Sequence, residues 1–234
     1  MNSIGIICAI RPEAKPIVDM LGLTLLEKCP FPIYQGEFNG NNYHLSICGL
    51  GKASAAASAQ SLIDKFNVAE IFNVGICGAL SGELAITDIV ISKHFIQHDF
   101  NIEEQGEHSC WHPTFKTHLI ETELPIVLNN IELHSADYRF GPIASGDKFI
   151  KSKLIKNALF EQTGAIVVDM ESSAIALVCK LNSVAFVSIR AVSDLAESIP
   201  HDFEHNMGKA IVNVSELMRK VLLVPQSNLH EKGS

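Results

Sequence analysis

Acidic residues follow or end three apolar runs of this 234-residue chain, and such positions can carry groups that move protons. Glu13 comes after the run Ser3 to Ile10, Asp169-Met170-Glu171 follows a second run, and Ser193-Asp194 ends a third. Burial beside apolar residues raises the pKa of a carboxyl group, so one such group can act as an acid while another acts as a base. The residue types and their placement therefore predict acid–base chemistry.

Each carboxylate also has a structural interpretation. Glu13 and Glu171 lie in the first turn of predicted helices, where the helix dipole favours negative charge, and Asp194 is a residue type that caps helices. Arg190 is different, because a cation that follows the run Phe186 to Ile189 is costly to bury unless a carboxylate meets it. We expect Glu171 or Asp194 to be that partner.

The segment Gly75-Ile76-Cys77-Gly78 follows another apolar run, Val68 to Val74. It matches neither the GxGxxG pattern nor a Walker A sequence, so it is weak evidence for a phosphate site. Its structural interpretation is a tight turn at the end of the strand.

Apolar, β-branched runs alternate with segments of helical spacing along the chain. Strands are predicted over Ser3 to Ile10, Pro32 to Phe38, Tyr43 to Cys48, Val68 to Val74, Ile86 to Ile91, Tyr138 to Ser145, Ala165 to Val168 and Val184 to Val192. Helices are predicted over about Pro12 to Leu21, Ala53 to Phe66, Ser152 to Phe160, Glu171 to Leu181 and Asp202 to Leu222, and a loop over about Asn101 to His118. This alternation predicts one α/β domain with a mostly parallel or mixed sheet. The candidate residues then fall at the carboxyl ends of strands, where such folds bind ligands.

Composition excludes several classes of protein. A net charge of −8 gives no general basic surface for nucleic acid, and no uncharged stretch reaches the roughly 18 residues of a membrane span. The six cysteines form no CxxC pair and are expected to be reduced thiols. These features predict a cytoplasmic protein that binds neither nucleic acid nor membrane.

A metal-binding module is an alternative from another functional class. His108, Cys110 and His112 alternate, which would place all three on one face of a strand. Scattered polar residues of a loop produce such triplets by chance, so the acid–base interpretation is preferred and no metal is expected. Metal analysis of the purified protein discriminates between the two.

Six motifs, in order along the chain, together resemble the 5′-methylthioadenosine/S-adenosylhomocysteine nucleosidases of the nucleoside phosphorylase superfamily. They are Ser3 to Ala9 leading to Glu13, Gly49-Leu50-Gly51-Lys52, Asn73-Val74-Gly75, Ser145 to Ile150, Asp169-Met170-Glu171 and Ser193-Asp194. The resemblance implies a three-layer α/β/α fold with a central mixed sheet over residues 1–224, followed by a polar tail at 225–234. It also implies a homodimer without a cofactor, which hydrolyses adenine from a 5′-thioribose.

The resemblance also implies catalytic roles. Asp194 corresponds to the general acid that protonates adenine at N7, with Ser193 orienting it, and Glu13 to the base that activates water. Glu171 corresponds to a clamp on the ribose hydroxyls, and Arg190 to the partner that organises Glu171 and the water.

Substrate-binding roles follow from the same resemblance. The Met170 backbone completes the ribose clamp, Phe149 corresponds to the ring that stacks on adenine, and the Ile150 backbone to the group that reads its edge. The residues corresponding to an apolar pocket for the 5′-alkylthio group are Ile10, Leu50 and Phe203.

Two positions depart from the family's common pattern. Ile76 stands where a small polar residue that can contact water or sugar is common, and Asp169 stands where Glu is usual. A phosphorylase is the first rival, with Arg11 as its possible phosphate ligand, although Asn73 replaces a cation that phosphorylases of the superfamily commonly carry. A futalosine-type nucleoside hydrolase is the second.

In the resembling family a loop of one subunit helps to close the 5′ pocket of the other. Here the corresponding stretch is His98 to Trp111, in which Phe100, Ile102 and Trp111 offer apolar contacts. An exposed apolar patch of this kind favours pairing of two subunits.

Overall fold

The computed structural model describes residues 2–28, 30–101, 110, 112–130, 138–198, 201 and 203–223. Within them, one mixed sheet contains β1 (Ser3–Cys8), β2 (Thr24–Glu27), β3 (Ile33–Phe38), β4 (Asn41–Ile47), β5 (Glu70–Ala79), β6 (Ile89–Ser92), β7 (His94–Gln97), β8 (Ile120–Glu121), β9 (Arg139–Phe140), β10 (Ile143–Ser145), β11 (Val167–Asp169) and β12 (Ala185–Asp194). The helices are α1 (Arg11–Leu21), α2 (Lys52–Phe66), α3 (Ile126–Asn130), α4 (Lys153–Thr163), α5 (Ser172–Asn182) and α6 (Phe203–Leu222).

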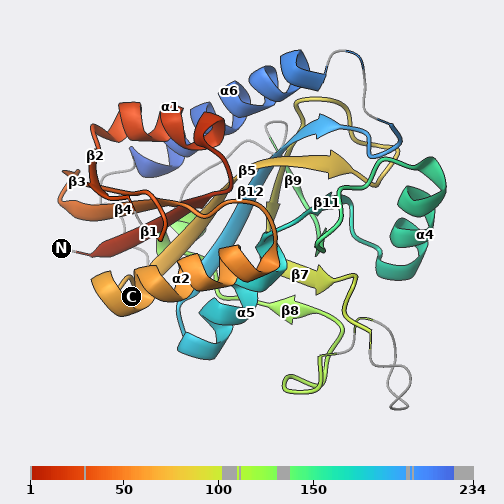
Figure 1. Cartoon of the computed structure of the whole chain (residues 1–234), viewed down its shortest axis with the longest axis horizontal. Helices are drawn as coiled ribbons and strands as arrows, with labels where there is room; N and C mark the ends of the chain where they lie inside the picture. The colour runs from red at the N-terminus through yellow and green to blue at the C-terminus, as the bar shows by residue number, and fades with distance from the viewer. Residues whose placement is uncertain are drawn as a thin grey trace.

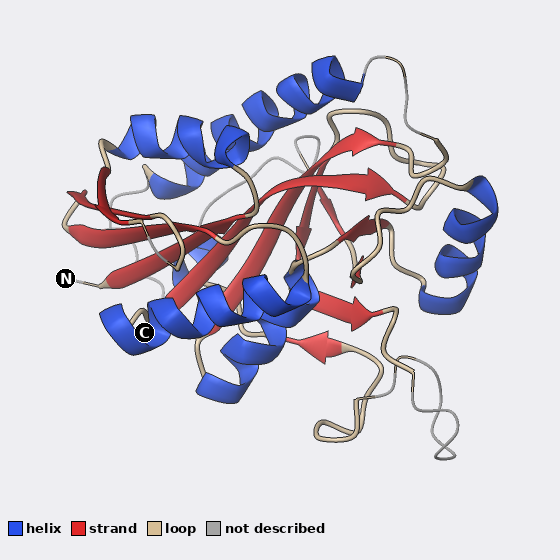
Figure 2. Cartoon of the chain, in the orientation of Figure 1, coloured by secondary structure: helices blue, strands red, loops and turns tan. Residues whose placement is uncertain are grey.

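The main sheet path runs β2-β3-β4-β1-β5-β11-β10-β7-β8, with β12 beside β5 and β6, and β9 beside β6. Helices α1 and α6 cover one face of the sheet, and α2 and α5 cover the other (Figures 1 and 2). The prediction of a three-layer α/β/α fold with a central mixed sheet is confirmed.

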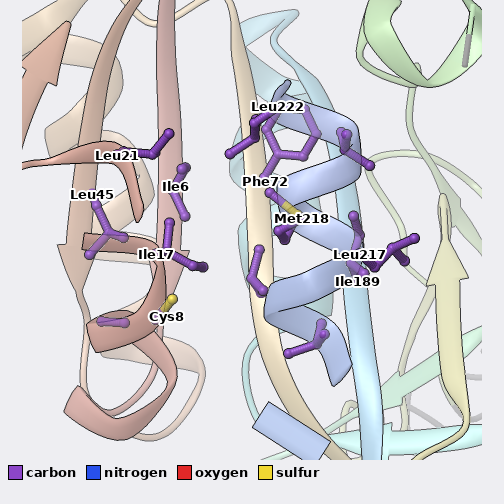
Figure 3. Packing of buried hydrophobic residues seen from close by; sticks show 14 of the residues in the cluster. Ile6, Cys8, Ile17, Leu21, Leu45, Phe72, Ile189, Leu217, Met218 and Leu222 are labelled. Atoms are coloured by element: carbon purple, nitrogen blue, oxygen red, sulfur yellow. The ribbon is translucent and has the colours of Figure 1, made fainter. Parts of the chain in front are cut away.

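Apolar side chains of the outer helices join the layers. On α6 the buried residues Ala210, Val214, Leu217 and Val221 recur at the spacing of one helical face. They share a cluster with buried residues of α1 and the strands, and Figure 3 shows members of this cluster from both helices and the sheet. On the opposite face, small residues of α2 and α5 pack against the sheet in a second cluster.

The central strand β5 changes its neighbour halfway along, and this opens the sheet. Its first half pairs with β1 up to Asn73, whereas its end pairs with the antiparallel strand β11 from Gly78 onward. On its other side β5 pairs with β12 nearly throughout. The segment between Asn73 and Gly78 therefore has a strand on one side and, on the other, a gap that the Glu13 side chain enters.

The predicted turn at Gly75 to Gly78 is wrong, because these residues continue β5. Gly75 is required by close packing: a Cβ there would lie 2.5 Å from Arg190 Nη1 and 2.8 Å from Glu13 Cδ. The single strand predicted from Tyr138 to Ser145 is two strands, β9 and β10, separated at Gly141-Pro142. Strands β2, β7 and β8 and helix α3 were not predicted.

Several predicted features lie outside the described residues. They are the polar tail at 225–234, the helix start at Asp202, His108 of the metal alternative, and Ile102 and Trp111 of the subunit-contact stretch.

Candidate active site

A pocket with about 590 Å³ of empty space, part of it open to solvent, lies at the gap in the sheet. Most of the predicted site residues line it: Ile10, Glu13, Leu50, Ile76, Phe149, Ile150, Met170, Glu171, Ser193 and Asp194. Segments that are far apart in the sequence are thus brought to one place. The sequence analysis did not assign a site role to Asp169 or Lys148, which also line the pocket.

Glu13 is held by three backbone N–H groups. Its Oε2 accepts hydrogen bonds from Ala9 N (2.9 Å) and Ile10 N (3.0 Å), and its Oε1 accepts one from Ile76 N (2.9 Å). The first two bonds cap the start of α1, and the third satisfies the N–H that β5 exposes in the gap. Burial raises the pKa of Glu13, although Arg190 and the three N–H groups oppose this. Glu13 therefore has both a structural role and a position in the pocket.

Asp194 ends β12 and is 3% exposed. Its Oδ1 accepts a hydrogen bond from Ala196 N at 2.9 Å, and its Oδ2 accepts one from Ser193 Oγ at 2.9 Å. Burial raises the pKa of Asp194 against these two hydrogen bonds. A carboxyl group in this environment holds a proton at higher pH than a solvated one does, as a general acid requires.

Arg190 is completely buried, and its main partner is Asp169 at 2.7 Å between Nη2 and Oδ2. Glu171 Oε2 lies 3.6 Å from the same nitrogen. The guanidinium also donates to the Asn73 side chain and to the hydroxyls of Ser172 and Ser188, whose distances from Nε are 3.4 and 3.2 Å. This set of polar side chains satisfies a charge that is otherwise costly to bury.

Of the two partners expected for Arg190, Glu171 is confirmed and Asp194 is not, since the salt bridges of Arg190 go to Asp169 and Glu171. Arg190 and Asp194 are four residues apart on one strand, which separates their backbones by about 13 Å.

The structure also gives a role to Asp169, which stands where Glu is usual in the family. Its carboxylate accepts the N–H groups of Glu171 and Ser172 at the start of α5, both at 3.3 Å, while it holds Arg190.

Glu171 faces the pocket from the start of α5. Its Oε1 accepts a hydrogen bond from Gly51 N at 3.0 Å, which ties the Leu50-Gly51 loop to α5. Burial is the main cause that raises its pKa to about 7, with Arg190 opposing and Asp169 assisting the rise.

Apolar side chains form the mouth of the pocket. Leu50 is 65% exposed and Phe149 45% exposed, although both line the pocket. Phe203 is not among the lining residues, but its ring meets that of Phe149 edge-on, with 6.1 Å between centroids. An aromatic face and a leucine at an open mouth suit a flat heterocycle with an apolar substituent.

The residues of the rival hypotheses lie elsewhere. Arg11 is exposed and lines a separate groove between α1 and β3, and Asn73 is buried against Arg190. Across the part of the chain that the structure describes, no cluster of three or more His, Cys, Asp or Glu side chains could hold a metal ion. None of the described helices combines the length and apolar character needed to cross a membrane.

Comparison with known proteins identifies the family. The sequence profile of the phosphorylase superfamily matches residues 3–223. The chain belongs to this superfamily. A 5′-methylthioadenosine/S-adenosylhomocysteine nucleosidase of Staphylococcus epidermidis is 34% identical over 218 residues, covering 91% of this chain and 96% of that protein. This identity places the chain in the nucleosidase family that its motifs resemble.

Solved structures of the superfamily have the same fold. A nucleosidase of this kind from Colwellia psychrerythraea 34H, in complex with adenine, has a TM-score of 0.85 and 28% identity, covering 97% of this chain and 96% of that one. A futalosine hydrolase mutant of Helicobacter pylori has a TM-score of 0.87 at 24% identity, covering 94% of this chain and 98% of that one. The second likeness shows the shared fold alone.

The Asp169–Arg190 pair predicts a large effect on stability. Asp169→Asn removes the closest counter-charge of a completely buried guanidinium, so we expect the free energy of unfolding to fall by about 3 kcal/mol. Urea denaturation measures this change. The control Asp19→Asn breaks an exposed pair with Lys15 and should change the free energy by less than about 0.5 kcal/mol. Equal stability of Asp169→Asn and the wild type would contradict the assigned pairing.

Proposed function

We propose that this protein hydrolyses the N-glycosidic bond of 5′-methylthioadenosine and S-adenosylhomocysteine, releasing adenine and a 5-thioribose. The observation that carries the proposal is one pocket lined by two buried carboxyl groups in different environments, Glu13 and Asp194. The named relative at 34% identity supports the choice of substrates. The enzyme is thus an N-glycosidase, with one catalytic domain over residues 1–224.

In this mechanism Asp194 supplies the proton that makes adenine a leaving group. Adenine departs poorly as an anion, so protonation at N7 by the Asp194 carboxyl group weakens the glycosidic bond. The Ser193 hydroxyl and the Ala196 N–H orient that carboxyl group. The ribose becomes oxocarbenium-like as the bond breaks. A water molecule then adds to C1′ of the ribose, and Glu13 takes a proton from this water.

Other residues bind the substrate. Glu171 and the Met170 backbone hold the ribose hydroxyls, while Arg190 acts from behind the pocket by fixing Glu171. Phe149 stacks on adenine and the backbone of Ile150 reads its edge. The apolar contacts to the 5′ substituent come from Ile10 and Leu50, which line the pocket, and from Phe203, whose ring lies edge-on to Phe149.

The open mouth of the pocket supports the proposal that two different 5′ substituents are accepted. In the single subunit Leu50 lines the pocket and is 65% exposed, so there is room at this leucine for a group beyond the 5′ sulfur. A methylthio group ends at this leucine, and a homocysteinyl group extends past it. Ile76 presents an alkyl side chain to the pocket and provides no hydroxyl for water or sugar.

We expect catalysis to be independent of phosphate, because Arg11 lies in a separate groove and Asn73 is engaged by Arg190. Mass spectrometry of the products formed from 5′-methylthioadenosine, with and without inorganic phosphate, measures this. Free methylthioribose should form at the same rate in both samples. A ribose 1-phosphate product would instead identify a phosphorylase.

We also propose that the enzyme works in the cytoplasm as a homodimer. The family resemblance supports pairing through the stretch His98 to Trp111. In the described part of this stretch, Phe100 is partly buried and stacks on His112, with 5.8 Å between ring centroids. Sedimentation at micromolar concentration tests the dimer, and a fully active monomer would contradict it.

A further inference from the structure

Lys156 is a buried lysine that the mechanism does not use. It lies on α4, and its side chain is only 6% exposed. Lysine is almost never buried to this degree unless it is paired. The neighbouring α4 residue Leu159 belongs to an apolar cluster with Ile150 and Ala196, so this face of α4 packs beside the pocket.

The partner of Lys156 lies in the turn that follows the proposed general acid. Lys156 Nζ is 3.1 Å from Glu197 Oε1, and Glu197 comes three residues after Asp194. Between them, Ala196 donates its N–H to Asp194 Oδ1 and has φ +54°, a left-handed conformation that is uncommon for alanine. The ion pair therefore connects α4 to the turn that supplies a hydrogen bond to Asp194.

This turn fits tightly against β5. A Cβ at Gly78 would lie 3.1 Å from Asp194 Oδ1 and 3.2 Å from the Ala196 Cβ. Because β5 leaves so little space, a displacement of the turn would change the position of the Ala196 N–H relative to the acid. A residue with a strained backbone, such as Ala196, persists only where the surrounding structure holds it in place. The ion pair between Lys156 and Glu197 is one contact that holds this turn.

We propose that Lys156 is a positioning residue that holds Asp194 in the geometry of a general acid through its ion pair with Glu197, while its own charge makes the Asp194 carboxyl group a stronger acid. The inference rests on the proposed function, in which Asp194 donates the proton.

Several groups face Asp194 besides Lys156. They are the Ser193 hydroxyl, the Ala196 N–H, and the Cys77 thiol of β5, while Lys156 and Lys153 both lie near Glu197. Burial raises the pKa of Asp194, and Lys156 is the cation that lowers it. Without that cation, the carboxyl group would become a weaker acid.

The pH profile of kcat/KM for 5′-methylthioadenosine tests this proposal. The acid must be protonated, so activity is lost as the pH rises through the pKa of Asp194. Lys156→Met removes the positive charge and keeps the apolar stem, so it should move this alkaline limb upward by about half a pH unit. Glu197→Gln leaves the Lys156 charge uncompensated and should move the limb downward. Lys156→Arg keeps the positive charge and should therefore show the same alkaline limb as the wild type.

The control is Lys209→Met, which removes an exposed lysine of α6, outside the helix that carries Lys156, and should leave the limb unchanged. An unshifted limb in folded Lys156→Met, or shifts of the same sign in Lys156→Met and Glu197→Gln, would overturn the proposal. If Lys156→Met does not fold, the direction of the Glu197→Gln shift decides. Asp194→Asn is assayed alongside: near wild-type turnover in it would show that the acid is another group, whereas its loss with an unshifted Lys156→Met limb refutes only the role of Lys156. Absence of adenine release by the wild type would refute the proposed function itself.

Discussion

Replacing Asp194 by asparagine is expected to lower kcat for 5′-methylthioadenosine by about 10²- to 10⁴-fold, the usual contribution of a general acid. The amide cannot deliver a proton to N7. It can still accept the Ala196 N–H and contact the Ser193 hydroxyl, so the turn after β12 keeps its hydrogen bonds. The measurement is adenine release at substrate saturation, together with thermal unfolding of the variant.

A control separates this loss from a general effect of the substitution. Asp64→Asn changes an exposed aspartate of α2 that contacts Gln60, outside the pocket, and should keep the wild-type kcat. A near wild-type kcat for Asp194→Asn would show that the acid is another group.

Glu13→Gln is expected to lower kcat by about 10²-fold or more, since the amide cannot take a proton from water. The variant has a second consequence that follows from the geometry of Glu13. Both carboxylate oxygens accept backbone N–H groups, and an amide must turn its NH₂ toward at least one of them. We therefore also expect a loss of about 1–3 kcal/mol in the free energy of unfolding.

Calorimetry with adenine distinguishes the catalytic from the structural role of Glu13. The folded variant should bind adenine with nearly wild-type affinity, because Phe149 and Ile150, which the proposal assigns to the base, are unchanged. Glu37→Gln, which changes an exposed glutamate of β3, is the matched control and should alter neither kcat nor stability. Loss of adenine binding by folded Glu13→Gln would indicate that Glu13 mainly shapes the pocket.

The longer elements and the main site residues could be predicted because burial imposes a pattern on them. The apolar runs of β1, β5 and β12 identify strands covered on both faces, and the residues that follow them lie at the pocket. Short elements such as β8, with two residues, and α3, with five, are too short to show a period. Their formation depends on tertiary neighbours.

The gap in the sheet and the closest partner of Arg190, Asp169, could not be predicted for a different reason. Glycine at position 75 suggests a turn when only the chain is considered, and its actual cause is the Glu13 and Arg190 side chains that fill the space beside it. The pairing of Arg190 with Asp169 depends on how β11 lies against β5. The buried arginine did signal that a carboxylate must be near, and the Asp169-Met170-Glu171 motif contained it.

Adenine release from purified protein in phosphate-free buffer tests the central claim most directly. The assay compares 5′-methylthioadenosine, S-adenosylhomocysteine and a futalosine-type nucleoside at equal concentrations. We expect multiple turnovers with the first two substrates, at a rate of the order of 1 s⁻¹ or faster. Cleavage of neither adenine nucleoside, or cleavage of the futalosine-type nucleoside alone, would contradict the proposed function.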